Sequence, residues 1–173
     1  SRRQRQMCIR DSCNAVMIAE ARTPKHEYYV ALLNDRVSQL PVLIASNQGG
    51  MSIEDVAKEN PDAIVTTPID FTKGLDFETA KQVAHKLGFS GSEQEKEAAD
   101  TFVKLYQLFS ERDATQVEIN PLAESEDGAV LCMDAKLGFD ENADFRQKEV
   151  FEMRDLTQED PSEVKAGKYG LNF

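Results

Sequence analysis

The stretch from residue 117 to residue 140 constrains the fold most, because it holds two apolar runs on either side of a turn sequence. The dipeptide Asp127-Gly128 is typical of a tight β-hairpin. A turn centred there pairs residues symmetrically, so we expect Asn120 and Asp134 to face each other within one residue of register. Directly opposite residues lie about 5 Å apart at Cβ. The hairpin therefore brings an amide and a carboxylate together in otherwise apolar strands.

The oxygens of Asn120 and Asp134 are hard ligands of the kind that Mg²⁺ prefers. Mg²⁺ takes few protein ligands, so the pair predicts a site where the ion orients a polyphosphate. Lys136 offers an alternative, since it shares a face with Asp134 and would form a structural ion pair with it while Asn120 caps the turn. Structural ion pairs are commoner than metal-binding sites, so the spacing alone does not decide between the ion pair and the magnesium site. Pro121 lacks an amide hydrogen, which predicts an edge strand or a bulge.

The other expected elements do not alternate strictly between strand and helix. A hairpin is expected to join a strand at 13–21 to one at 27–35, and its far side carries Glu20 and Glu27. Apolar runs and helical spacing predict further strands at 41–46 and 63–69, and helices at 53–58, 76–89, 92–113 and 140–153. This order excludes a doubly wound parallel sheet. It favours an α+β fold with a mostly antiparallel sheet and helices packed on it.

Charge and composition exclude several classes of protein. The net charge is −11, which argues against a nucleic-acid partner. No run approaches the ~20 apolar residues of a membrane helix, so no membrane association is expected. Three cysteines without metal spacing indicate a reducing compartment. The two histidines, His26 and His85, lack a partner pattern for nucleophilic work, so we expect no phosphohistidine on this chain.

Both ends of the chain are unusual. Residues 1–12 carry four arginines and one aspartate, without periodicity or a signal-peptide core, and resemble translated sequencing-adaptor sequence. We expect a non-native or disordered arm there, and the alternative is a basic native arm. The last residues, 169–173, are mostly apolar, so we expect an interior piece of a longer protein.

Several motifs in order resemble one family. They are "MIAEA", "EYYVALLNDR", "ASNQGGMSIEDVA", "QVEINPLAES", "GAVLCMDAKLGFDENADFRQ", "RDLTQEDP" and "KYGLNF". In this order they resemble the β subunits of succinate–CoA ligases (succinyl-CoA synthetases), which are ATP-grasp proteins. The likeness covers about residues 13–173. It implies that 13–138 is part of an ATP-grasp nucleotide-binding domain and that the acidic segment 139–173 leads to a CoA-ligase domain that this sequence lacks.

The resemblance implies roles for particular residues. Asn120 and Asp134 match the family's ligands for the Mg²⁺ that accompanies the nucleotide. Glu20 and Glu27 match carboxylates that contact the nucleotide, and Thr23 lies in the loop between them. The alternative for the two glutamates is a solvated hairpin end.

Glu118 matches a residue that faces the phosphoryl-transfer path and contacts the partner's phosphohistidine loop. The alternative is a carboxylate held by Lys136. The Gly-Gly pair of "SNQGG" follows a strand, yet it lacks the P-loop pattern, and we interpret it as a structural turn.

The resemblance also implies an acid–thiol ligase that couples cleavage of succinyl-CoA to phosphorylation of ADP or GDP in the tricarboxylic acid cycle. Its cofactor is Mg²⁺, its substrates include CoA and ATP/ADP or GTP/GDP, and its partner is an α subunit in the mitochondrial matrix. The family's phosphate-binding lysine and succinate-binding residues lie outside this stretch, so we expect the stretch alone to be inactive. Two alternatives remain, namely a malate–CoA or related acyl-CoA ligase and a non-catalytic acidic interaction module.

Overall fold

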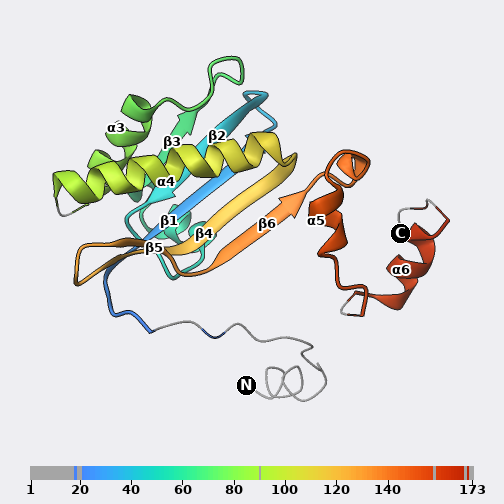
Figure 1. Cartoon of the computed structure of the whole chain (residues 1–173). Helices are drawn as coiled ribbons and strands as arrows, with labels where there is room; N and C mark the ends of the chain where they lie inside the picture. Colours follow the sequence, from blue (N-terminus) through green and yellow to red (C-terminus); the bar gives the residue numbers. More distant parts are fainter. Residues whose placement is uncertain (1–17, 19–20, 90, 158, 170, 172–173) are drawn as a thin grey trace.

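The computed structural model describes the chain except for residues 1–17, 19–20, 90, 158, 170 and 172–173. Within that part, six strands form one sheet in which every neighbouring pair is antiparallel (Figure 1). The strands are β1 (Pro24–Asp35), β2 (Leu40–Ser46), β3 (Ile64–Pro68), β4 (Ala114–Ser125), β5 (Val130–Cys132) and β6 (Ala135–Phe139). Their order is β3-β2-β1-β4-β5, and β6 also pairs with β4. The predicted α+β class is confirmed. The predicted arm at 1–12 lies outside the described residues.

The helices largely follow the predicted ranges. They are α2 (Ile53–Glu59), α3 (Phe77–Leu87), α4 (Ser92–Glu111), α5 (Lys148–Glu152) and α6 (Pro161–Gly167), with short 3₁₀ helices η1 (Pro61–Ala63) and η2 (Glu141–Ala143). Asp76 caps α3 by accepting from the Thr79 N–H, and Gly88 ends it in the left-handed conformation. None of the described helices is both long and apolar enough to cross a membrane.

The single helix predicted at 140–153 is wrong, because η2 and α5 are separate. The buried side chain of Gln147 donates to the Glu111 carbonyl and to the Asp113 carboxylate, and Arg146 pairs with Asp113. These contacts hold the intervening residues at the turn between α4 and β4, which interrupts the helix. The chain then continues through α5 and α6, beyond the edge of the sheet (Figure 1).

One face of the sheet carries the main hydrophobic core. The helices α3 and α4 lie across this face (Figure 1). On β1 the even-numbered side chains Tyr28, Val30 and Leu32 point into it, and Phe102 of α4 lies among them fully buried. Tyr29, one residue along β1, is also buried but belongs to the opposite face. We call this opposite face the open face, since neither α3 nor α4 covers it.

The partner of β1 differs from the expected one. The segment Tyr29–Leu33 pairs with β2 on one edge, and from Val30 to Leu33 with β4 on the other. No edge is left there for the predicted hairpin with residues 13–21, most of which lie outside the described residues. The hairpin partner of β1 is β2, because Asp35 accepts from the Val37 and Ser38 N–H groups and closes a tight turn between them.

The middle of β4 bulges, as Pro121 predicts. Tyr28 pairs with Leu122 whereas Val30 pairs with Ile119, so two residues of β4 stand opposite a single residue of β1. The peptide bond that precedes Pro121 is cis.

The bulge changes which side chains of β4 face the core. Val117 and Ile119 point into the core before it, and Leu122 does so after it. Glu118 and Asn120 are half-buried and lie on the open face. The bulge thus lets a core strand present two polar side chains without placing them among the helices.

Replacing Phe102 by alanine is expected to destabilise the protein by about 3–5 kcal/mol, because the ring is fully buried between α4 and the sheet. Gln107→Ala, on the exposed side of the same helix, is the control and should stay within about 0.5 kcal/mol of the parent. Urea unfolding followed by circular dichroism measures both. Equal stabilities for the two variants would contradict this packing.

Candidate functional site

The hairpin around Asp127-Gly128 has the predicted register. Leu122 pairs with Cys132 and Ile119 with Ala135, which places Asn120 directly opposite Asp134. The Asn120 N–H donates to the Asp134 carbonyl at 3.2 Å. The amide and the carboxylate that the sequence predicts as neighbours are therefore cross-strand partners.

The side chain of Asn120 is held at both ends. Its Oδ1 accepts from the Gly50 N–H at 2.8 Å, and its Nδ2 donates to the Met51 carbonyl at 2.9 Å. Asp134 is exposed, and among the described residues its carboxylate has no hydrogen bond or ion pair. The alternative in which Lys136 pairs with Asp134 is wrong, because no such ion pair forms in this structure.

The residues fit a magnesium ion that shares its coordination sphere with phosphate. Over the described ranges, no group of three or more His, Cys, Asp or Glu side chains is arranged to hold a metal ion. A carboxamide oxygen has two lone pairs, and the Gly50 N–H uses one of those on Asn120, so one remains. An amide oxygen and a free carboxylate suit Mg²⁺, which takes its other ligands from water and phosphate.

Glu118 lies on the same face, two residues before Asn120. It stands directly opposite Lys136 in the register, yet its carboxylate accepts from Gln116 Nε2 at 2.8 Å. No ion pair between Glu118 and Lys136 forms within 4.0 Å, so the alternative in which this lysine holds Glu118 is not supported. Glu118 is half-buried, and its carboxylate is held on this face by Gln116 instead of by Lys136.

The predicted nucleotide contacts are only partly described. Glu20 lies outside the described residues. Thr23 is exposed immediately before β1, four residues from Glu27, which is about 13 Å along an extended chain. Glu27 is half-buried on β1, and its carboxylate reaches the loop at Gly50, where an added Cβ would lie 2.4 Å from Oε2. The structure therefore brings Glu27 and Asn120 to the same loop, and it leaves Thr23 nearer the end of the sheet.

A family model described as the ATP-grasp domain matches residues 6–124. This chain belongs to the ATP-grasp family. It is 57% identical over 161 residues to the β subunit of an ADP-forming mitochondrial succinate–CoA ligase of Neurospora crassa, covering 93% of this chain and 36% of that protein. It is 58% identical over 159 residues to the GDP-forming mitochondrial β subunit of Dictyostelium discoideum, with 92% and 38% covered.

The chain spans a little over a third of the length of these relatives. A solved structure of ATP citrate lyase from Methanothrix soehngenii superposes with a TM-score of 0.62 at 19% identity, covering 84% of this chain and 33% of that one. At that identity the likeness supports the fold alone. Fold and sequence thus agree on an ATP-grasp domain.

Sequence reasoning missed a buried acid in this ATP-grasp chain. Glu124 is 1% exposed, and its carboxylate oxygens lie 3.4 Å from the Tyr28 hydroxyl and 3.4 Å from Lys25 Nζ. Burial, followed by the charge of Glu124, raises the pKa of Tyr28. These contacts tie the start of β1 to the end of β4. The available signal was a lone carboxylate in an otherwise buried strand end.

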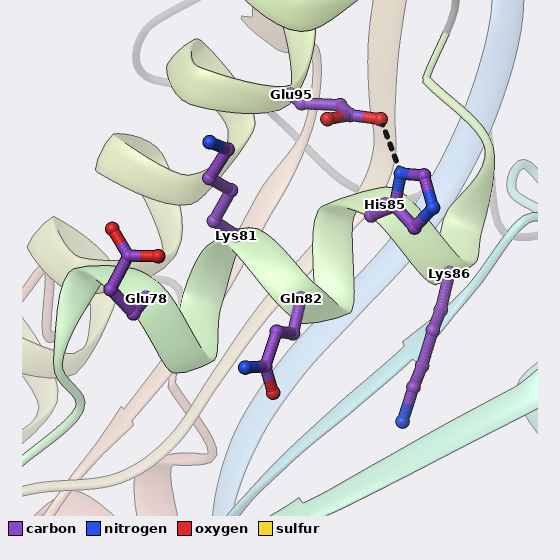
Figure 2. Close-up of a pocket in the computed structure, with 6 residues that line it drawn as sticks. All are labelled: Glu78, Lys81, Gln82, His85, Lys86 and Glu95. Carbon is purple, nitrogen blue, oxygen red and sulfur yellow. Dashed lines mark hydrogen bonds and ion pairs between the residues drawn. The ribbon is translucent and has the colours of Figure 1, made fainter.

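A hollow of about 500 Å³ lies on the outer side of α3, away from the open face. Figure 2 shows His85 turned toward Glu95, with a distance of 2.8 Å between Nδ1 and the carboxylate, whereas Gln82 and Lys86 point the other way. His85 therefore has a partner that its sequence spacing did not indicate. The pair links α3 to α4, and the exposed, mixed-charge lining carries no built ligand site.

The open face also perturbs a tyrosine. Burial raises the pKa of Tyr29 to about 12, and the charges of Glu118 and Glu54 add to this. The hydroxyl of Ser52 holds the pKa of Glu54 below its usual range, with a smaller contribution from Lys136. The carboxylates of Glu118 and Glu54 therefore both lie close enough to Tyr29 to disfavour ionisation of its hydroxyl.

The raised pKa of Tyr29 predicts alkaline destabilisation. Because the folded-state pKa lies above the ordinary 10.0, this contribution to stability is complete below pH 10 and is lost as the pH rises toward 12. The unfolding free energy of the parent should fall faster than that of Tyr29→Phe in this window, by up to about 1.4 kcal/mol per pH unit. Denaturant titrations at several pH values measure the difference. The control is Tyr169→Phe at an exposed position, and a parent-like slope for Tyr29→Phe would refute the assignment.

Proposed function

We propose that this chain is the nucleotide-binding part of the β subunit of a succinate–CoA ligase. The complete enzyme converts succinyl-CoA, inorganic phosphate and ADP or GDP to succinate, CoA and ATP or GTP. The observation that carries the proposal is the cross-strand pair of Asn120 and Asp134, in a chain more than half identical to such β subunits. The two residues offer hard oxygen ligands on one face of an ATP-grasp sheet.

The chain contributes positioning and charge complementarity, which are the main demands of phosphoryl transfer. Asn120 and Asp134 hold the Mg²⁺ that offsets the charge of the nucleotide phosphates. Glu27 and Asn120 both lie at Gly50, which supports a shared site, and Glu27 orients the nucleoside together with Thr23 and Glu20. The exposure of Thr23 supports this role, because a rim residue must be reachable from solvent.

Glu118 contacts the partner subunit during phosphoryl transfer. It is half-buried on the open face, without an ion pair to Lys136, and it lies two residues from the proposed metal ligand Asn120. A carboxylate there can accept a hydrogen bond from a histidine presented by a second subunit. We assign that histidine to the α subunit, because His85 and His26 of this chain already contact Glu95 and the Asn47 carbonyl.

The setting of the complete enzyme follows from the same proposal. The chain works in the mitochondrial matrix within the tricarboxylic acid cycle, together with an α subunit. Residues 13–138 belong to the nucleotide-binding domain and 139–173 lead toward the CoA-ligase domain. The relatives include ADP-forming and GDP-forming enzymes at nearly equal identity, so the binding experiments below use both ADP and GDP.

Asp134→Asn in the complete β subunit, assembled with its α partner, is expected to lower turnover at least tenfold. The variant removes the charge from a metal ligand, while the exposed position limits the loss of stability to about 0.5 kcal/mol. Steady-state assays over a range of Mg²⁺ concentrations measure the effect, and Asp62→Asn provides the same chemical change at an exposed site elsewhere. A collapse in thermal stability with unchanged Mg²⁺ dependence would make Asp134 a structural residue instead.

Calorimetry separates this function from a non-catalytic interaction module. The complete β subunit is expected to release heat on binding ADP or GDP with Mg²⁺ and to bind more weakly with EDTA present. No heat with either nucleotide would favour the interaction module.

A further inference from the structure

The loop of residues 49–51, at the end of "SNQGG", fixes the orientation of the Asn120 carboxamide. A backbone N–H can only donate and a carbonyl can only accept, so the oxygen of Asn120 must face Gly50 and its nitrogen must face Met51. The two bonds exclude the flipped amide. They also aim the remaining lone pair of Oδ1, since both ends of the planar group are held.

The same loop is fastened to β1. The Gly49 N–H donates to the Glu27 carbonyl at 3.0 Å, and His26 Nε2 donates to the Asn47 carbonyl at 2.9 Å. A Cβ on Gly49 would lie about 2.5 Å from backbone atoms of Tyr28, which cannot move aside as a flexible side chain can. Only glycine allows the loop to approach this strand so closely.

Gly50 connects the two halves of the candidate site. Its φ of +72° favours glycine, and an added Cβ would meet the Glu27 carboxylate at 2.4 Å. Its N–H holds the oxygen of Asn120. One residue therefore touches the proposed nucleotide-binding carboxylate and orients the proposed metal-binding amide.

We propose that residues 49–51 are a positioning element that holds Asn120 in its metal-binding orientation and fixes its placement relative to Glu27. This rests on the proposed function, because it assigns the loop a role toward the same metal–nucleotide site. The Gly-Gly pair then has a purpose beyond that of a turn. Its contacts set the direction in which a ligand oxygen points. A metal site with only two protein ligands is sensitive to that direction.

Gly50→Ala and Gly88→Ala form a matched pair for the test. Gly88 has a φ of +79°, and an added Cβ there would meet nothing within 4 Å. Both variants introduce similar backbone strain at a positive φ, and only at Gly50 does the added Cβ also meet a side chain, that of Glu27. Only Gly50→Ala is expected to raise the dissociation constant for Mn²⁺ in the presence of ADP, by about tenfold or more, and to raise KM for the metal nucleotide with a smaller change in kcat.

Electron paramagnetic resonance of free Mn²⁺, in the complete β subunit assembled with its α partner, gives this affinity without relying on turnover. Equal Mn²⁺ affinities for the two variants would overturn the positioning role and leave the proposed function intact. If the parent protein itself binds no Mn²⁺ with ADP or GDP, the proposed function fails instead.

Asn120→Asp keeps the test decisive if Gly50→Ala does not fold. The aspartate retains an oxygen ligand and can accept from the Gly50 N–H, but it has no N–H to donate to the Met51 carbonyl. If the loop did not constrain residue 120, the added negative charge of the aspartate should make Mn²⁺ bind more tightly. If the orientation set by the loop matters, the variant should bind at least several-fold more weakly, and tighter binding would contradict the proposal.

Discussion

The pairing of β1 with β4 is the constraint on which the candidate site depends. These strands are separated in the sequence by two other strands and three α-helices, yet they lie side by side at the centre of the sheet. Their register places Ala31 opposite Glu118 and Glu27 opposite Ala123. The bulge between these pairs is where Asn120 lies, and it is also where the loop from β2 crosses. Without this pairing, the residue predicted to contact the nucleotide, Glu27, and the residue predicted to bind the metal, Asn120, would not lie on the same surface.

The sheet separates stability from chemistry by using its two faces differently. Tyr28 and Phe102 belong to the face that α3 and α4 cover, where apolar burial stabilises the fold. Glu118 and Asn120 belong to the open face, where their side chains are half-buried and have hydrogen-bond partners. Because neighbouring residues on a strand point to opposite faces, a single strand serves both. A substitution on the open face can therefore change ligand binding at a small cost in stability.

Local signals in the sequence predicted the local structure well. The turn at Asp127-Gly128 fixed the hairpin register, and Pro121 marked the bulge, because both effects act within a few residues. Helical spacing likewise predicted a helix at 76–89, and the structure has α3 at Phe77–Leu87. Each of these features depends on backbone geometry that a short stretch of sequence encodes.

Long-range contacts were beyond the sequence patterns. Alternation identifies a strand at 27–35 but not its neighbours, so its central pairing with β4 was missed. Helical spacing at 140–153 gave no sign that Gln147 would anchor itself on Asp113 and break the helix. The bonds from the Gly50 loop to Asn120 likewise join residues seventy positions apart. The family resemblance named the site residues, whereas the structure supplied the contacts that orient them.

The most direct test of the account is a crystal structure of the complete β subunit with Mn²⁺ and ADP, using anomalous scattering to locate the ion. The account predicts one manganese peak within coordination distance of Asn120 Oδ1 and the Asp134 carboxylate, with nucleotide phosphate completing the sphere and the Gly50 bond to Asn120 intact. A nucleotide-bound manganese ion coordinated by other residues, with Asn120 and Asp134 pointing away from it, would contradict the account.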